Sequence, residues 1–148
     1  MNTISLLGCG YLGFPLALEL LKKGYYIKGS TTTPSKLHQL KTVGIIPYLI
    51  NLEENILPDF FKADVLVLTL PYKRSFSDPN SYINQIKIVC NSVRASSIHH
   101  IVFTSSSSVY PKDNIIYSPS DKFQPTNLRA KVLLECEEIL NELENISV

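Results

Sequence analysis

Short apolar runs alternate with amphipathic stretches along the chain, and this alternation predicts its secondary structure. The run DVLVLTL at residues 64–70 is almost continuously apolar, which is typical of a strand covered on both faces. Leu12, Leu16 and Leu20 instead fall on one face of a helix. The predicted strands lie at residues 3–7, 25–29, 45–50, 64–70 and 100–104. The predicted helices lie at residues 11–23, 34–43, 80–95 and 126–143.

Strands that alternate with helices indicate an α/β fold built on a doubly wound parallel sheet, the Rossmann fold. Right-handed crossovers then favour the strand order 3-2-1-4-5. Residues 146–148 resemble the first residues of a sixth strand. The sequence therefore looks truncated before or within that strand, as a fragment of a longer protein would.

Composition narrows the class of protein further. A chain of 148 residues with 45% hydrophobic content is expected to form one domain with a single sizeable core. The net charge of +1 gives no general attraction to nucleic acid or to an anionic membrane, and the apolar runs are too short for a membrane span. Cys9, Cys90 and Cys136 share no metal-ligand spacing. We therefore expect no metal site and a reduced, cytoplasmic setting.

A glycine-rich turn follows the first predicted strand and opens the first predicted helix. It reads GCGYLG, with Gly8 suited to a tight turn, Gly10 to the close approach of a pyrophosphate, and Gly13 to close packing of the helix. The helix start supplies free N–H groups and the positive end of a dipole. We expect a dinucleotide to contact this turn, with Tyr11 and Leu12 included; the alternative is a glycine turn without a ligand.

The tip of the second strand bears on which dinucleotide binds. NAD sites usually place an acidic residue about 20 residues after the first glycine, to hold the ribose 2′-hydroxyl. Here no acidic residue lies between Glu19 and Glu53. Hydroxyl groups from Ser30, Thr31 and Thr32 are present instead, followed by Lys36 and its positive charge. We expect NADP to be preferred over NAD; the alternative is that these residues only cap the helix that follows.

Two further strand ends should border the same ligand. Asn51 and Leu52 follow the third strand, and Leu70 and Pro71 follow the fourth. Sheets of this type bind ligands at the carboxyl ends of their strands, so these residues are candidates for contacts to the adenine and to the rest of the cofactor. Ordinary loop residues are the alternative at both places. Lys73–Arg74, just beyond, is expected in a solvated loop.

The fifth strand ends in four consecutive serines, in the stretch TSSSSVY at residues 104–110. Together with the glycine turn, this stretch resembles the short-chain dehydrogenase/reductase superfamily. The resemblance is greatest to its extended or atypical branch, which includes NAD-dependent nucleotide-sugar epimerases and dehydratases. Aligned on Val109 and Tyr110, it implies that Ser106 is the serine that hydrogen-bonds the reacting oxygen of the substrate.

The same resemblance implies a Tyr-x-x-x-Lys pair on the next helix, which this sequence lacks. In that branch a proline stands four residues before the tyrosine and a glutamate eight after it. Pro125 and Glu137 then put Arg129 at the tyrosine position and Leu133 at the lysine position. The usual acid and base are therefore missing.

A shift of register by two residues does not restore the pair. It provides Lys131 but puts Asn127 in place of the tyrosine. Tyr110 or Tyr117 could act as a substitute acid, although a structural role is favoured for both. Arg129 could bind an anionic group of the substrate, although a surface arginine is the simpler interpretation.

These features predict an NAD(P)-binding domain over residues 1–148, with the substrate-binding region outside this chain. The expected function is hydride transfer at a carbonyl or nucleotide-sugar carbon. The alternatives are a non-catalytic dinucleotide-binding or redox-sensing module and a Rossmann domain of the hydroxyacid-dehydrogenase type. The expected partners are the dinucleotide and a small-molecule substrate, without nucleic acid or membrane, and a homodimer is compatible with the sequence.

Overall fold

The structure is a computed structural model in which residues 2–54, 56–72, 78, 80–111, 113, 115–118, 121, 124–144 and 146–148 are described. Lys73–Arg74, expected in a solvated loop, lies outside the described residues. Across the described ranges, none of the helices has the length and apolar character that a bilayer crossing would require.

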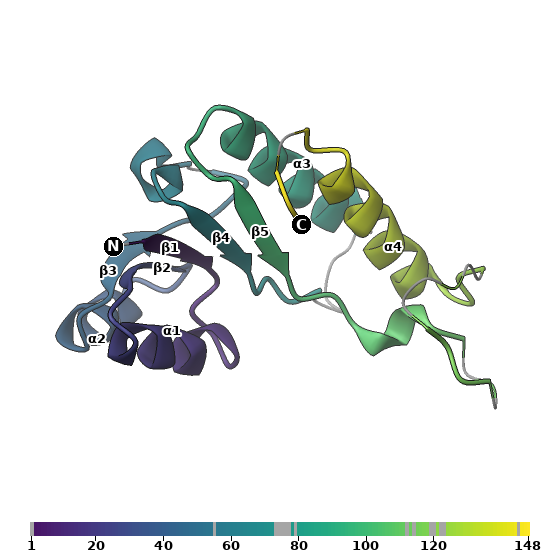
Figure 1. Ribbon diagram of the computed structural model, residues 1–148, viewed down its shortest axis with the longest axis horizontal. Helices are drawn as coiled ribbons and strands as arrows, with labels where there is room; N and C mark the ends of the chain where they lie inside the picture. Colours follow the sequence, from purple (N-terminus) through teal and green to yellow (C-terminus); the bar gives the residue numbers. More distant parts are fainter. Residues whose placement is uncertain are drawn as a thin grey trace.

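A parallel five-stranded sheet forms the centre of the molecule, in the order β3-β2-β1-β4-β5 (Figure 1). This confirms both the predicted Rossmann-type fold class and the predicted strand order. The first strand of the sequence is central because the chain moves outward on one side and then crosses over to the other. The strands are β1 (Thr3–Leu7), β2 (Tyr26–Thr31), β3 (Ile46–Leu49), β4 (Val65–Leu68) and β5 (His100–Phe103).

Helices cover both faces of this sheet. Figure 1 shows α1 and α2 together on one face and α3 and α4 on the other. The helices are α1 (Gly13–Lys22), α2 (Lys36–Thr42), α3 (Asn80–Arg94) and α4 (Leu128–Asn141). Two short 3₁₀ helices, η1 (Pro58–Phe61) and η2 (Ser107–Val109), lie in the connections.

Alternation along the central strand divides the core into two parts. Ile4 and Leu6 pack with Ala17 of α1 and Leu40 of α2, whereas Leu7 belongs to the cluster that contains the buried faces of α3 and α4. Successive side chains of a strand point to opposite faces, so a strand between two helical layers has to be apolar on both. This explains the continuous apolar runs in the sequence.

Several element ends differ from the predicted bounds by one or two residues, and the 3₁₀ helices η1 and η2 were not predicted. β2 continues through Ser30 and Thr31, because these residues still pair with Tyr48 and Leu49 of β3. The helix η1 brings Phe60 and Phe61 into the core, where both are almost completely buried.

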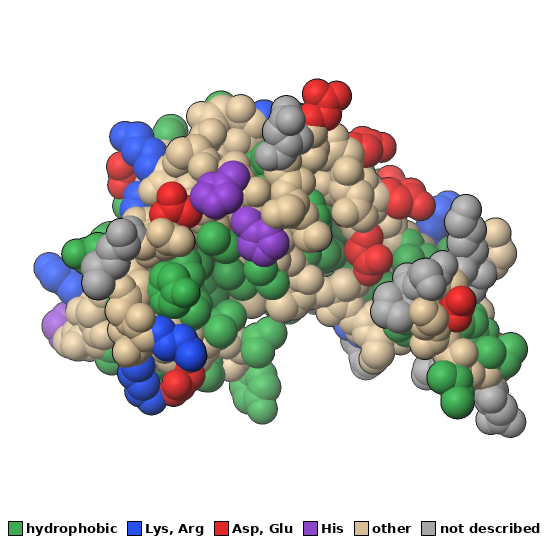
Figure 2. All heavy atoms as spheres, viewed as in Figure 1, with side chains coloured by type: hydrophobic (Ala, Val, Ile, Leu, Met, Phe, Trp, Pro, Cys, Tyr) green, Lys and Arg blue, Asp and Glu red, His purple; other side chains and the backbone are tan. Residues whose placement is uncertain are grey.

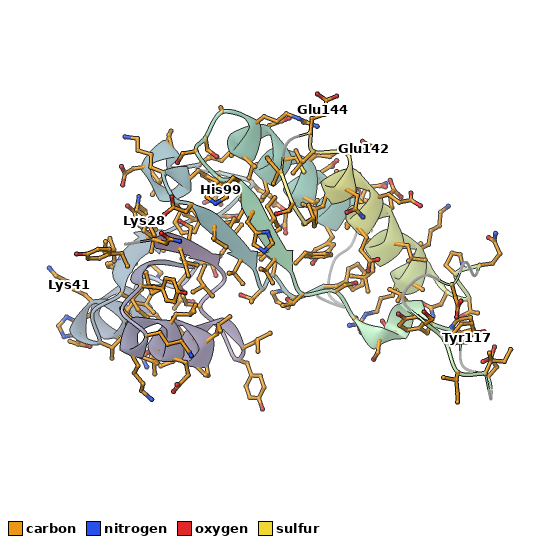
Figure 3. The ribbon with its side chains drawn as sticks, in the orientation of Figure 1. Lys28, Lys41, His99, Tyr117, Glu142 and Glu144 are labelled. Atoms are coloured by element: carbon orange, nitrogen blue, oxygen red, sulfur yellow. The ribbon has the colours of Figure 1, made fainter. Side chains whose placement is uncertain are left out.

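A polar cluster that runs from the buried Ser5 and Lys28 to the exposed Asp59 holds η1 against the sheet. The hydroxyl of Ser5 donates to the carbonyl of Phe60 at 2.5 Å, and the ammonium of Lys28 (labelled in Figure 3) donates to the carbonyl of Lys62 at 3.0 Å. The hydroxyl of Tyr48 donates to Asp59 Oδ2 at 2.5 Å. This hydrogen bond, with the nearby Lys28 charge, lowers the pKa of Asp59. The buried polar groups of this sheet face are thereby paired, as burial requires.

Residues 146–148 lie beside β5, where the sequence predicted the beginning of a sixth strand. Ser147 forms an isolated parallel bridge with His100. The N–H of Ile101 donates to the carbonyl of Ser147 at 2.8 Å, and the N–H of Ser147 donates to the carbonyl of His99 at 3.2 Å. The chain thus returns to the edge of the sheet after α4.

Charge is unevenly distributed over the surface. Figure 2 shows Lys and Arg side chains gathered over the side formed by α1 and α2, and acidic side chains over the side formed by α4. Lys22, Lys36 and Lys41 lie in the first pair of helices, and Glu135 and Glu138 lie in α4. The net charge near zero therefore conceals a positive side and a negative side.

Candidate functional site

The glycine turn connects β1 to α1 at the carboxyl edge of the sheet. Gly8 has φ of 109°, in the left-handed region that favours glycine, as expected for the tight turn. The N–H of Gly10 donates to the carbonyl of Gly8 at 2.8 Å, and the N–H of Phe14 donates to the carbonyl of Gly10 at 3.1 Å. The turn thus passes directly into the helix.

Ser30 and Thr69 hold this turn from the two neighbouring strands. Ser30 Oγ accepts a hydrogen bond from the N–H of Gly8 at 2.9 Å, and the Ser30 carbonyl accepts one from the N–H of Cys9 at 2.8 Å. The hydroxyl of Thr69 donates to the carbonyl of Gly8 at 2.6 Å. The sequence suggested Ser30 as a ligand contact or as a cap of the following helix, and it contained no signal for Thr69.

Gly13 is required by packing within the protein. A Cβ atom at this position would lie 2.2 Å from the carbonyl oxygen of Gly8 and 2.8 Å from Thr69 Oγ1. No side chain can be accommodated at such distances from backbone, so the close approach of α1 depends on glycine here. Cys9 fills the space beneath the turn, and burial raises the pKa of its thiol to about 11.

Gly10 has a different environment from the other two glycines of the motif. A Cβ atom here would meet nothing within 4 Å, and Gly10 is not among the glycines with positive φ. Neither backbone conformation nor packing against the described residues therefore requires glycine at this position.

The start of α1 offers positive potential beside Gly10. Leu12 occupies the N-cap position without a capping side chain, and the first turn contains no acidic residue. The N–H of Phe14 already donates to Gly10 and Pro15 has no N–H, so the positive end of the helix dipole is the main feature that favours an anion here. Tyr11 is fully exposed next to this position and Leu12 is 52% exposed.

A cavity of about 370 Å³ opens beside the turn at the carboxyl ends of the strands. It brings together most of the positions that the sequence suggested as cofactor contacts. Those in its lining are Gly8, Gly10, Ser30, Thr31, Thr32, Asn51, Leu52, Leu70 and Pro71. Tyr11, Leu12 and Gly13 are not in its lining, and Gly13 is buried beneath the turn.

The hydroxyl-rich strand end has an inner and an outer part. Ser30 and Thr31 are buried, and Thr31 Oγ1 accepts a hydrogen bond from the N–H of Thr33 at 3.1 Å. Thr32, Thr33 and Lys36 are exposed and line the cavity. The outer residues are therefore the ones that a ligand at this end can reach freely.

One wall of the cavity was not predicted from the sequence. Gln85 of α3 donates through Nε2 to Glu53 Oε1 at 3.1 Å, and the N–H of Glu53 donates to Asn51 Oδ1 at 3.3 Å. Glu53 follows β3 closely, so its position at the strand end was a usable signal. Gln85 lies in the middle of a helix, where no local pattern indicates a contact 32 residues away.

The serine cluster lies after β5, in a second cavity of about 360 Å³. Ser106 caps η2: its Oγ accepts from the N–H of Ser108 at 3.2 Å and lies 2.9 Å from Ser108 Oγ. The hydroxyl of Ser105 donates to Glu137 of α4. Ser106 is not in the lining of the cavity at the glycine turn, so its predicted catalytic role stays a prediction.

The side chains at the two dyad positions have different environments. Leu133 is 3% exposed and belongs to the core between α3 and α4. Arg129 lies over the ring of Tyr72, with Cζ 5.7 Å from the ring centroid. Its Nε is shielded from solvent and has no hydrogen-bond partner among the described residues. Arg129 therefore differs from an ordinary surface arginine, because it contacts an aromatic ring and its Nε is shielded from solvent.

The two tyrosines considered as substitute acids stack on each other. The ring centroids of Tyr110 and Tyr117 are 5.8 Å apart. Tyr117 lies on a loop that projects away from the sheet (Figure 3), and its hydroxyl donates to Asp113 Oδ2 at 2.7 Å. This hydrogen bond raises the pKa of Tyr117, which makes it a poorer proton donor.

Sequence comparison finds curated relatives of this chain. No family model matches the chain. Protein YeeZ of Escherichia coli K12 is 32% identical over 154 residues, covering 100% of this chain and 56% of its own length. This chain thus spans little more than half of the curated relatives that it matches.

Solved structures with a similar fold are also matched over about half of their length. The UDP-glucose 4-epimerase of Bifidobacterium longum, in complex with NAD+ and UDP, superposes with a TM-score of 0.75 at 19% identity, over 95% of this chain and 48% of the epimerase. The UDP-glucuronic acid 4-epimerase of Bacillus cereus, in complex with NAD, gives 0.76 at 17% identity, over 94% and 51%. A functionally unknown conserved protein of Silicibacter pomeroyi gives 0.71 at 18% identity, over 99% and 50%. The chain has the Rossmann fold of these epimerases. The predicted resemblance to the epimerase-like branch is confirmed at the level of the fold.

Proposed function

We propose that the cavity at the glycine turn binds a nicotinamide dinucleotide. The observation that carries this proposal is the environment of Gly10. A Cβ atom at this position would extend into open space, and nothing in the described protein requires glycine there. A ligand group that passes close to the backbone would explain why glycine stands at position 10. A pyrophosphate at this point would also meet the uncapped start of α1.

The size and lining of the cavity support the same ligand class. Its volume of about 370 Å³ falls within the usual range of small-molecule sites. Asn51 and Leu52 would border the adenine, and Leu70 and Pro71 would border the part of the cofactor nearer β4. The structural neighbours named as NAD complexes share this fold.

NADP is the preferred dinucleotide in this proposal. The segment from Ser30 to Lys36 has no carboxylate that would repel a 2′-phosphate, and Lys36 and Thr32 line the cavity on its exposed side. Glu53 is the nearest acidic residue in the lining, and its carboxylate is engaged by Gln85. The positive surface near α1 and α2 favours the approach of an anionic ligand (Figure 2).

For the whole protein, we infer that residues 1–148 form the dinucleotide-binding portion of an atypical reductase or epimerase. The bound nicotinamide would supply hydride transfer, at a carbonyl or nucleotide-sugar carbon of a small-molecule substrate. Ser106 would hydrogen-bond the reacting oxygen of that substrate. The substrate-binding region would lie in the part of the relatives that this chain does not span.

A non-catalytic dinucleotide-binding or redox-sensing module is the second candidate. It is favoured by α4, where Arg129 and the buried Leu133 occupy the positions of the expected Tyr-x-x-x-Lys pair. A Rossmann domain of the hydroxyacid-dehydrogenase type remains the third candidate, because the glycine turn alone would suit it equally well.

Calorimetric titration with NADPH and NADH tests the dinucleotide site. Gly10→Val should abolish binding while circular dichroism shows an intact fold, because the added side chain meets no protein atom but occupies the space of the pyrophosphate. Ala95→Val, at an exposed position beyond the end of α3, is the matched control and should bind as the wild type does. Unchanged affinity in a folded Gly10→Val protein would remove the cofactor hypothesis.

A further inference from the structure

Arg129 lies at the carboxyl edge of the sheet, the edge that carries the cavity. It is the second residue of α4, whose start is capped by Asn127 through a hydrogen bond of 2.9 Å from the N–H of Ala130 to Asn127 Oδ1. The chain leaves β5 at this edge and returns along α4, so the helix begins on the same side as the loop after β4 (Figure 1). Arg129 is therefore close to the strand ends without being part of them.

A chain of aromatic contacts connects Arg129 to the cavity wall. Its guanidinium lies over Tyr72, whose ring centroid is 5.5 Å from that of Tyr82 at an interplanar angle of 81°. The hydroxyl of Tyr82 donates to the carbonyl of Leu70 at 2.9 Å. Leu70 and Pro71 line the cavity, and Tyr72 follows directly. The position of Arg129 is thus fixed relative to the predicted cofactor.

The charge of Arg129 has no counter-ion in the described part of the chain. The ion pairs found there join Lys22 to Glu19 and join Lys28 and Lys62 to Asp59. Arg129 Nε is buried and has no acceptor among the residues that the structure describes. A cation above a ring is attracted through the ring face, a contact that uses none of the five N–H donors of a guanidinium. A partly buried cation whose Nε–H has no acceptor is unfavourable unless an anion completes it.

The cavity between α4 and the serine cluster has the opposite character. Glu137 and Asp121 line it together with the serine cluster, so it presents carboxylates and hydroxyls. An anionic group would be repelled there and attracted at Arg129. This contrast separates the two sides of α4 by the charge of what each can bind.

We propose that Arg129 binds an anionic group of the substrate, a carboxylate or a phosphate, beside Tyr72, which follows the cavity-lining Pro71 but is itself outside the lining. This inference rests on the proposed dinucleotide site, because it places the anion beside that site. The planar fork of a guanidinium matches both groups in a bidentate manner, and stacking on Tyr72 holds the fork in place. Arg129 thereby takes a binding role at the helix position where the acid was expected.

Anion titrations of the wild-type chain and two variants test this inference. Inorganic phosphate and malonate are titrated at constant ionic strength, with and without saturating NADPH, and sodium chloride serves as the control for screening. Arg129→Met should weaken binding of the preferred anion at least tenfold. Arg94→Met, at the exposed end of α3, is the matched control and should leave it unchanged. Tighter binding of phosphate would assign a phosphoryl group, and tighter binding of malonate a carboxylate.

The two proposals fail in different ways. Equal anion affinity in wild type and a folded Arg129→Met protein overturns the inference, whatever NADPH does. Absence of NADPH binding overturns the dinucleotide site, while the anion arm is still measured. NADPH affinity within twofold of wild type in Arg129→Met, together with the loss of anion binding, supports both.

A second measurement is made on the wild-type chain, with Arg129→Lys used only to assign a resonance, and it covers the case in which Arg129→Met misfolds. The sequence contains three arginines, Arg74, Arg94 and Arg129. In a ¹⁵N-labelled wild-type chain, phosphate or malonate should shift one arginine Nε–H resonance in a saturable manner, and Arg129→Lys should remove that resonance from the spectrum. A saturable shift of another arginine, or none, would contradict the inference.

Discussion

At the scale of single residues, the glycines of the turn serve three separate purposes within six positions. Gly8 adopts a backbone conformation that other residues avoid, Gly13 leaves room for a neighbouring carbonyl, and Gly10 leaves room for something outside the described protein. Only the first two contribute to the stability of the fold. Stability and ligand binding should therefore separate when these positions are substituted.

Gly13→Ala should destabilise the protein by about 1–3 kcal/mol, because its Cβ would overlap the carbonyl oxygen of Gly8. Gly10→Ala should leave stability within about 1 kcal/mol of wild type, since its Cβ meets no protein atom. Urea unfolding of both variants measures the difference. Equal destabilisation by the two substitutions would contradict the distinction drawn between these glycines.

Dinucleotide choice should respond to a carboxylate at Thr32. Of the two threonines expected to contact the ligand, Thr31 is buried and its hydroxyl accepts a hydrogen bond from the N–H of Thr33, whereas Thr32 is exposed in the cavity lining. Thr32→Glu should lower the NADPH-to-NADH affinity ratio at least tenfold, about 1.4 kcal/mol, by repelling the 2′-phosphate. Thr32→Gln controls for size and should keep the ratio. A wild-type protein that already prefers NADH tenfold would refute the premise.

Individual site residues differ in how far sequence could predict them. The glycine turn was predictable because its motif is local and its context, strand before and helix after, is visible in the hydrophobic pattern. The bonds from Ser30 and Thr69 to the turn were not, because their partners lie 22 and 61 residues away. The environment of Arg129 could not be predicted either, because it depends on Tyr72, which is distant in the sequence.

At the scale of elements, α4 is held at its start by a side-chain cap and α2 is not. Asn127 Oδ1 accepts from the N–H of Ala130, while Ser35 occupies the N-cap of α2 without a capping bond. A satisfied N-cap stabilises a helix because it pairs one of its free N–H groups. The predicted anion site depends on this helix start, since Arg129 lies in it.

Asn127→Ala should therefore cost about 1 kcal/mol of stability, and Ser35→Ala less than about 0.5 kcal/mol. Thermal or urea unfolding of the two variants provides the comparison. Similar losses in both would indicate that the Asn127 bond adds no stability. The anion titration should detect the Asn127 substitution as well, as a weaker effect than that of Arg129→Met.

Elements with a clear periodicity were predicted close to their observed bounds. The central strand matches at both ends, and α3 was expected at residues 80–95 and is found at Asn80–Arg94. The helix η1 was missed because a single turn has no periodicity to detect. β2 extends further than expected because pairing with β3, rather than hydrophobicity, carries it through Ser30 and Thr31.

At the scale of the whole molecule, the carboxyl edge of the sheet collects the glycine turn, the hydroxyl-rich strand end, the loop after β4 and the serine cluster. Sequence placed these segments at one edge because parallel strands all end there. It could not show that the serine cluster and the glycine turn border separate cavities, since that depends on how the segments after each strand are packed.

Ser106→Ala should leave dinucleotide affinity within about twofold of wild type, because Ser106 lies outside the lining of the first cavity. In the longest natural form of the protein, turnover should fall by roughly 10²-fold if Ser106 hydrogen-bonds the developing charge. Residues 1–148 alone should show no turnover. NADPH oxidation with a panel of carbonyl substrates is the assay, and Ser107→Ala is the control. Robust activity that Ser106→Ala does not change would place the chemistry elsewhere.

Restoration of the missing Tyr-x-x-x-Lys pair would require the substitution of a core residue. Tyrosine at Arg129 and lysine at Leu133 would complete the spacing, but Leu133 is 3% exposed in the core. A lysine there would forfeit about 1.5–3 kcal/mol of apolar burial and carry a charge without water. Core packing around Leu133 thus leaves no solvated space for a lysine at the second position of the pair.

The hydrogen bond that Ser30 Oγ accepts from the glycine turn also restricts how this protein can change over evolutionary time. A mutation that removes the Ser30 hydroxyl would release the N–H of Gly8 and so loosen the loop that we propose to bind the pyrophosphate. Drift in cofactor preference is therefore channelled to Thr32, Thr33 and Lys36, which are exposed and play no part in that anchor. Lineages that exchange one dinucleotide for the other should vary at these three positions while they retain a hydroxyl at position 30.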